Sequence, residues 1–106
     1  MTHRVEWTRR AQDDLDRWFD FLIERELARD DGDLALAGRA IEAIRGAVAM
    51  LERPPSTCRK ASDDGFIREL VIAFGATGYL VLFDVSFEAQ VLVIAVRHQR
   101  EEGYVG

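Results

Sequence analysis

Apolar residues recur along the first half of the chain with a helical period. After a short alternating segment, residues 3–8, apolar positions return every three or four residues in two stretches. The first consists of Ala11, Leu15, Trp18, Phe19, Leu22 and Ile23, and the second of Leu34, Ala37, Ile41, Ile44, Val48 and Leu51. This spacing predicts a half-buried strand followed by two amphipathic helices. Trp7, Trp18 and Phe19 are expected in the core; the alternative is that one of them belongs to an exposed apolar groove for a partner.

The ends of these two helices carry sequence signals. Thr8 is a residue type that caps helix N-termini, and Gly32 can take the left-handed conformation that ends a helix. Asp33 can then cap the second helix, which Pro54 and Pro55 should stop because neither donates the helical hydrogen bond. The many acids of the first helix are spaced around its outer face, where solvation accounts for them. So short a turn predicts an antiparallel helix hairpin.

The period changes to that of strands after residue 65. The segments "FIRELVIAF", "GYLVLFDVSF" and "QVLVIAVRH" are rich in β-branched and aromatic residues and are separated by short turn signals. Short connections of this kind join antiparallel strands. The predicted order is β-α-α-β-β-β. It describes an α+β fold in which the helix hairpin packs on one face of a mainly antiparallel sheet.

The bulk composition fits a single folded domain over residues 1–106. Hydrophobic residues make up 48% of the chain and charged residues 31%, which is ordinary for a folded protein. No apolar run approaches the roughly 20 residues needed to cross a membrane, and the first ten residues lack the apolar stretch of a signal peptide. A single cysteine excludes an internal disulfide. We therefore expect a cytoplasmic protein that does not contact the membrane.

The formal net charge of −5 argues against direct nucleic-acid binding. Affinity for phosphates rises with each phosphate that a basic side chain neutralises. The two richest basic segments, residues 59–64 and 97–102, each contain two acids that cancel their cations. Neither segment therefore offers an electrostatic surface for RNA or DNA.

Most catalytic templates are missing, and one polar segment remains. No Gly-rich phosphate loop or metal-binding pair of histidines or cysteines is present, so no cofactor or metal is predicted. After the last apolar strand, however, Arg97, His98, Arg100 and Tyr104 lie close together in sequence. They could cleave RNA without a metal by stabilising phosphorane charge and moving protons, or they could bind a protein partner. Arg68, inside a strand, forms either a structural ion pair or a functional contact.

Several segments together resemble the RelE/ParE family of bacterial type II toxins. They are "VEWTRRAQDDLDRWFDFL", "AIEAIRGAVAMLERPP", "IRELVI", "GYLVLFDV" and "VLVIAVRHQREEGY". The resemblance covers nearly the whole chain, and the segments follow one another in the order of the family's elements. It implies either ribosome-dependent mRNA cleavage, as in RelE-like members, or inhibition of DNA gyrase, as in ParE-like members. It also implies a cognate antitoxin that wraps the toxin.

The resemblance favours the ParE-like branch. RelE-like toxins usually carry an arginine after the tyrosine of the third strand, where this chain has Leu80. Losing an arginine that contacts transition-state charge costs on the order of 3 kcal/mol. We therefore expect a gyrase inhibitor, rather than an enzyme, with a ParD-like antitoxin; the alternative is a metal-independent endoribonuclease that uses the Arg97 to Tyr104 cluster. On the first interpretation Arg68 and the same cluster bind the target or the antitoxin.

Overall fold

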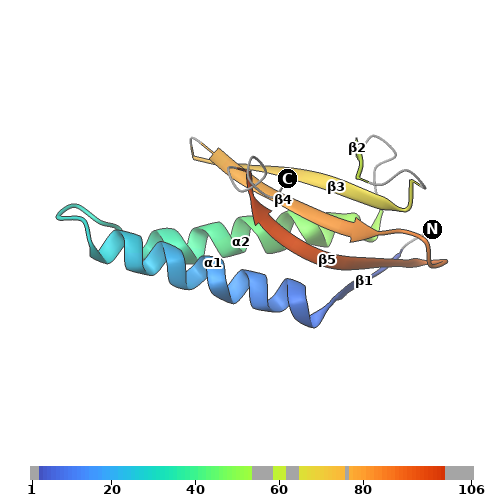
Figure 1. The fold of residues 1–106 in the computed structure, drawn as a ribbon, viewed down its shortest axis with the longest axis horizontal. Coiled ribbons are helices and arrows are strands. Elements are labelled where there is room, and N and C mark those ends of the chain that lie inside the picture. Colours follow the sequence, from blue (N-terminus) through green and yellow to red (C-terminus); the bar gives the residue numbers. More distant parts are fainter. Residues whose placement is uncertain (1–2, 54–58, 62–64, 76, 100–106) are drawn as a thin grey trace.

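The computed structural model describes residues 3–53, 59–61, 65–75 and 77–99, and it confirms the expected order of elements. In chain order the elements are β1 (Arg4–Trp7), α1 (Arg9–Leu27), α2 (Ala35–Ala49), the 3-10 helix η1 (Met50–Glu52), β2 (Arg59–Lys60), β3 (Ile67–Phe74), β4 (Thr77–Asp84) and β5 (Gln90–His98). The expected stop at Pro54 and Pro55 lies outside the described residues. Apart from η1 and the two-residue β2, the order is β-α-α-β-β-β. Figure 1 shows α1 and α2 side by side beneath one face of the sheet.

The sheet is mixed, and its strand order is β1-β5-β4-β3-β2. β1 runs parallel to β5, whereas the other neighbours are antiparallel. β3 and β4 form a hairpin whose turn contains Gly75 with φ of 62°, a conformation that glycine adopts without steric strain. The sheet therefore has two edges, one at β1 and one at β2 and β3.

The core lies between the helices and this one face of the sheet. Its largest fully buried side chains are Phe83, Leu15, Ile44, Leu51, Val48, Val81, Val91, Val93 and Val96. Trp18 is 7% exposed and belongs to the core as expected, while Trp7 is half-buried against it. The two amphipathic stripes read from the sequence are therefore largely confirmed.

The assignment of two apolar residues to these buried stripes is wrong. Phe19 is 40% exposed and Leu34 is 51% exposed. Phe19 follows Trp18 directly, and one residue turns the helix by about 100°, so the two side chains cannot both face the sheet. Leu34 precedes the first residue of α2, in the helix connection. Phe19 therefore lies on the surface of α1, where a partner could contact it.

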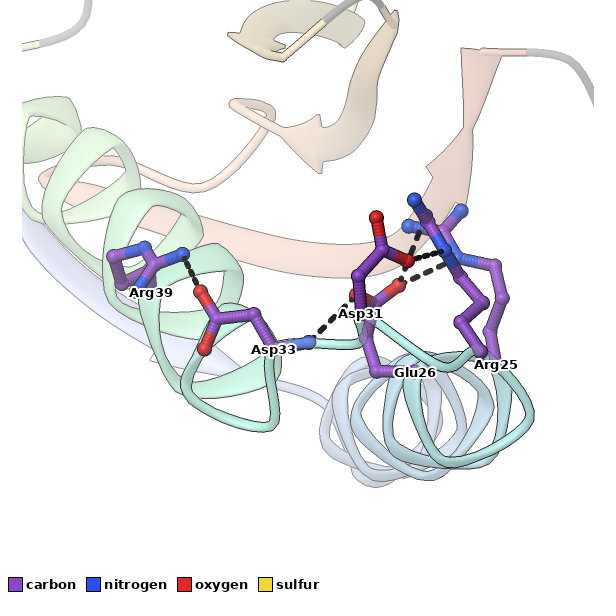
Figure 2. Close-up of polar contacts among 6 residues, drawn as sticks. Arg25, Glu26, Asp31, Asp33 and Arg39 are labelled. Carbon is purple, nitrogen blue, oxygen red and sulfur yellow. Dashed lines mark hydrogen bonds and ion pairs between the residues drawn. The ribbon is translucent and has the colours of Figure 1, made fainter.

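The helix connection is organised around the buried carboxylate of Glu26 (Figure 2). Its Oε1 accepts a hydrogen bond from the Asp33 backbone N–H at 3.0 Å. Its Oε2 pairs with Arg25 at 3.3 Å and Arg29 at 3.6 Å. Glu26 is 5% exposed, so the expectation that the acids of α1 are all solvated is wrong here. The carboxylate is buried because it supplies an acceptor to the returning chain.

Gly32 is required in this connection for a different reason from the one expected. Among the described glycines, only Gly65 and Gly75 have a positive φ, so Gly32 does not end the helix in a left-handed conformation. Instead, a Cβ on Gly32 would overlap the carbonyl oxygen of Glu26. Asp33 does support the start of α2, because its Oδ1 accepts from the Ala35 N–H at 3.0 Å.

Stability at acidic pH is expected to depend on Glu26. The hydrogen bond from Asp33 N–H holds the pKa of Glu26 below its ordinary value of 4.5, against the opposing effect of burial and with help from Arg25 and Arg29. A carboxyl group whose pKa is lowered by folding stabilises the folded state at pH values above its ordinary pKa. This stabilisation is lost as the pH falls through the pKa of the folded state. Urea unfolding of the wild type and Glu26→Gln, at pH values from about 3 to 6, should therefore give a shallower pH dependence for the variant.

The control for this measurement is Glu24→Gln, which changes an exposed acid of the same helix. Asp33 also has a lowered pKa, chiefly through its hydrogen bond from Arg39, so the wild type and both variants should share that contribution. If Glu26→Gln follows the wild-type pH profile, Glu26 does not stabilise the connection in the way that we describe.

Candidate functional site

The edge of β5 is covered first by β1 and then by the start of α1. β1 pairs with β5 as far as Trp7 and Val93. Beyond that point, the Thr8 N–H donates to the Val93 carbonyl at 3.0 Å. The Thr8 hydroxyl donates to the Val93 and Ile94 carbonyls at 2.9 and 3.1 Å, and it accepts from the Ala11 N–H as the expected N-cap. One side chain therefore caps the helix and closes the strand edge.

Two further side chains of α1 bond the backbone of β5 beyond the end of β1. Asp14 Oδ2 accepts a hydrogen bond from the Val96 N–H at 2.9 Å, and the Trp18 indole N–H donates to the Val96 carbonyl at 3.0 Å; both contacts are buried. They satisfy the two backbone groups that a neighbouring strand would otherwise bond. We call Thr8, Asp14 and Trp18 the edge clamp.

Asp14 was expected among the solvated acids of the first helix, and that expectation is wrong. Its residue exposure is 8%. The signal was present in the sequence, because Asp14 lies three residues after Ala11 and four before Trp18, on the apolar stripe itself. A buried acid requires a hydrogen-bond partner, and here the partners are a strand N–H and the guanidinium of Arg17, 3.3 Å away.

A bulge in β5 determines which side chains at its end face the helices. The pairing with β4 skips Ile94, because two successive β4 residues lie opposite Val93 and Ala95. An extra residue of this kind shifts the alternation of faces by one position. Val93 and Val96, three residues apart, are consequently both in the core beneath the helices.

This shift turns His98, rather than Arg97, towards the helices. His98 lies opposite Tyr79, whose ring belongs to the core face, whereas Arg97 lies opposite Leu80. Directly opposed residues of an antiparallel pair share a face. His98 therefore points to the helix side of the sheet and Arg97 to the other side, as adjacent residues of a strand do.

His98 is half-buried and belongs to an aromatic cluster. Its ring centroid lies 5.8 Å from that of Trp18 and 5.4 Å from that of Tyr79. The Tyr79 and Trp18 rings are 6.0 Å apart, and Phe21 lies 5.9 Å from Trp18. Burial raises the pKa of Tyr79, and the charge of Arg25 opposes that rise. Edge-to-face contacts of this kind fix the relative positions of α1 and the end of β5.

Arginines alternate with these aromatic rings on the surface of α1. The Arg17 guanidinium lies 4.6 Å from the Trp18 ring centroid, and that of Arg25 lies 5.9 Å from the Phe21 ring centroid. Phe21 is 47% exposed. We call Arg17, Trp18, Phe21, Arg25 and His98 the α1–β5 patch. Arginine and aromatic residues are the types most enriched at protein interfaces, so this patch is suited to binding a partner.

The remaining site residues predicted from sequence do not converge on this patch. The Nε of Arg68 donates to the Gly65 carbonyl at 2.9 Å, and Arg68 lies opposite Phe83, on the helix side of the sheet. The register places Arg68 two strands across and about three residues along from Arg97, or roughly 14 Å away at the backbone. Arg100 and Tyr104 lie outside the described residues.

Two kinds of site are absent from the described part of the chain. No group of three or more histidine, cysteine, aspartate or glutamate residues there could hold a metal ion. None of the described helices is long and apolar enough to cross a membrane.

Comparison with known proteins identifies the family. Residues 5–103 match the family model described as "ParE toxin of type II toxin-antitoxin system, parDE". Among solved structures, the chain is similar to one titled "Chromosomal ParDE TA system from P. aeruginosa", with a TM-score of 0.70 and 18% identity over 92% of this chain and 96% of that one. None of the curated proteins matches the sequence. The structural similarity confirms the expected α+β fold.

Proposed function

Because the chain belongs to the ParE toxin family of type II toxin-antitoxin systems, we propose that it inhibits DNA gyrase and that a ParD-like antitoxin neutralises it. The family match over residues 5–103 is the observation that carries this proposal. Inhibition would proceed by binding, without a reaction catalysed by the toxin. The α1–β5 patch, Arg97 and Arg68 are the described surfaces that we assign to binding the target or the antitoxin.

The geometry at the end of β5 supports binding rather than RNA cleavage. A phosphate-cleaving site needs its charge-stabilising and proton-transferring groups around one phosphate. Arg97 and His98 point to opposite faces of the sheet, and His98 packs against Trp18 and Tyr79. Leu80, which stands where RelE-like toxins carry an arginine, is 3% exposed. This arrangement disfavours the alternative in which Arg97, His98, Arg100 and Tyr104 form a catalytic cluster.

The antitoxin segment that we expect is basic or amphipathic and binds partly by adding a strand to the sheet. The exposed face of α1 carries the acids Asp13, Asp16, Asp20 and Glu24, which favour a basic partner. The antitoxin strand can add to a sheet edge whose backbone groups are unpaired.

A gyrase supercoiling assay tests the proposal directly. The chain freed of antitoxin is expected to inhibit supercoiling, and the product of the adjacent reading frame is expected to bind the chain and restore it. Arg68→Ala and Arg97→Ala should each raise the inhibitory concentration by about tenfold if they contact gyrase; if they contact the antitoxin, they should weaken rescue instead. Arg10→Ala, an exposed arginine near the start of α1, is the matched control.

Full supercoiling in the presence of excess antitoxin-free chain would contradict the proposed target. Cleavage of a reporter mRNA on ribosomes, abolished by Tyr104→Ala, would establish the alternative instead. If the neighbouring gene product forms no complex with the chain, the assignment of the antitoxin is wrong.

A further inference from the structure

The outer edge of β3 lacks a partner strand over its second half within the described residues. β2 pairs with β3 only at Arg68 and Glu69. The Ala61 N–H donates to the Ile67 carbonyl, so the backbone groups of Ile67 point away from β4. Because this orientation alternates along a strand, those of Val71 and Ala73 also point outwards. Val71 is 47% exposed and Ala73 is exposed.

This edge carries none of the usual features that prevent strand pairing. Residues 70–74 read Leu-Val-Ile-Ala-Phe, without a charge or a proline, and their register with β4 contains no bulge. The end of β5 is different, because its outward backbone groups beyond β1 are bonded by the edge clamp. Exposed, regular and apolar edges pair with other chains.

The sequence of the edge is complementary to itself. If two copies align antiparallel about Ile72, Val71 of each copy lies opposite Ala73 of the other. Their outward N–H and C=O groups then form hydrogen-bonded pairs, and no like charges oppose each other. The two-fold axis would stand perpendicular to the sheet, so the helices of both copies would lie on the same side.

The helix layer offers a second contact on the same side of the molecule. The Arg45 guanidinium lies 5.9 Å from the Trp7 ring centroid, which marks the flank of α2 that is turned towards β1. The opposite flank lies roughly 160–200° around the helix. It is turned towards β3, because β1 and β3 lie towards opposite ends of the strand order (Figure 1). This flank consists of Leu36, Ala43 and Ala47, followed by Met50 of η1, and it contains no charge.

The side chains of this flank leave surface for a neighbour. Leu36 and Ala43 are only half-buried and lie outside the core, and Met50 is 76% exposed. Small alanine side chains allow a second helix to approach closely. Pairing two copies through β3 would therefore extend both the sheet and the helix layer.

We propose that, without its antitoxin, this chain forms a symmetric homodimer through antiparallel pairing of β3 with β3, centred on Ile72. The short strand makes the dimer weak and dependent on protein concentration. An antitoxin strand added at the same edge competes with the second copy. This proposal does not depend on gyrase being the target.

Sedimentation velocity of the antitoxin-free chain over a range of concentrations tests the proposal. The wild type is expected to shift from monomer to dimer. Ala73→Pro removes the outward N–H without breaking the ladder to β4, and it should raise the dimer dissociation constant by at least about tenfold. Ala73→Val is the matched control, because it keeps the N–H and should dimerise like the wild type.

A charge exchange tests the register and keeps the proposal testable if Ala73→Pro fails to fold. Val71→Lys alone should weaken the dimer. Val71→Lys combined with Ala73→Glu should restore it, because the two new charges lie opposite each other only in the register centred on Ile72. A wild type that stays monomeric overturns the proposal, as does a dimer that survives Ala73→Pro or is not restored by the double substitution.

Discussion

Trp18→Ala is expected to lower the free energy of unfolding by about 3 to 5 kcal/mol, the range for deleting a buried tryptophan side chain. Trp18 is 7% exposed. Its ring contacts Phe21, Tyr79 and His98, and its indole N–H donates to the buried Val96 carbonyl. The substitution removes both the packing of α1 against the end of β5 and one donor of the edge clamp.

Trp18→Phe separates these two contributions. Phenylalanine retains most of the ring volume but has no N–H, so the Val96 carbonyl loses its donor. This variant is expected to cost about 1 to 2 kcal/mol. Urea unfolding followed by far-UV circular dichroism gives both values. A cost below about 1 kcal/mol for Trp18→Ala would show that the aromatic cluster is not part of the cooperative core.

The order of the elements was predictable because periodicity reports which side chains are buried. The helical stripe containing Leu15, Trp18 and Leu22 and the strand pattern after residue 65 require only that each element buries one side. The cap at Thr8 was also predictable, since it needs only a hydroxyl beside the first turn. Such local signals do not depend on where the rest of the chain lies.

The contacts that depend on long-range pairing were not predictable from these patterns. The bulge at Ile94 leaves an apolar sequence apolar, so nothing local shows which of Arg97 and His98 faces the helices. The overlap that makes Gly32 necessary involves the backbone of Glu26, six residues earlier. A glycine in a turn suggests a left-handed conformation, but here it is required because the chain passes close to itself.

The end of β5 and the outer edge of β3 differ in how their backbone polar groups are satisfied, and this difference relates the fold to its proposed interactions. At β5, side chains from α1 bond the backbone after β1 ends, and the same helix presents Phe21 and Arg25 to the surface. At β3, by contrast, no described element covers Val71 and Ala73. The end of β5 is therefore closed to strand addition, whereas the outer edge of β3 is suited to it.

Asp14→Ala is expected to lower the free energy of unfolding by about 2 to 3 kcal/mol, because it leaves the Val96 N–H buried without an acceptor. The contact at 2.9 Å is buried and spans 82 residues of sequence. The loss of the ion pair with Arg17 adds little, since the Arg17 side chain is 53% exposed and is screened by solvent. Native-state hydrogen exchange should show that protection is lost first at the Val96 amide.

Two control substitutions distinguish the lost acceptor from the lost charge. Asp14→Asn keeps an acceptor oxygen and should cost about 1 kcal/mol or less. Asp13→Ala removes a neighbouring acid whose pairing with Arg9, at 3.8 Å, is largely exposed, and it should change stability by less than about 0.5 kcal/mol. If Asp14→Asn is as destabilising as Asp14→Ala, then the charge of Asp14 rather than its acceptor oxygen holds β5. A double-mutant cycle tests whether the edge clamp acts as a unit. Because Asp14 and Trp18 bond the same residue of β5, Asp14→Ala and Trp18→Phe should couple by at least about 0.5 kcal/mol. Strict additivity would show that the edge clamp does not act as a unit.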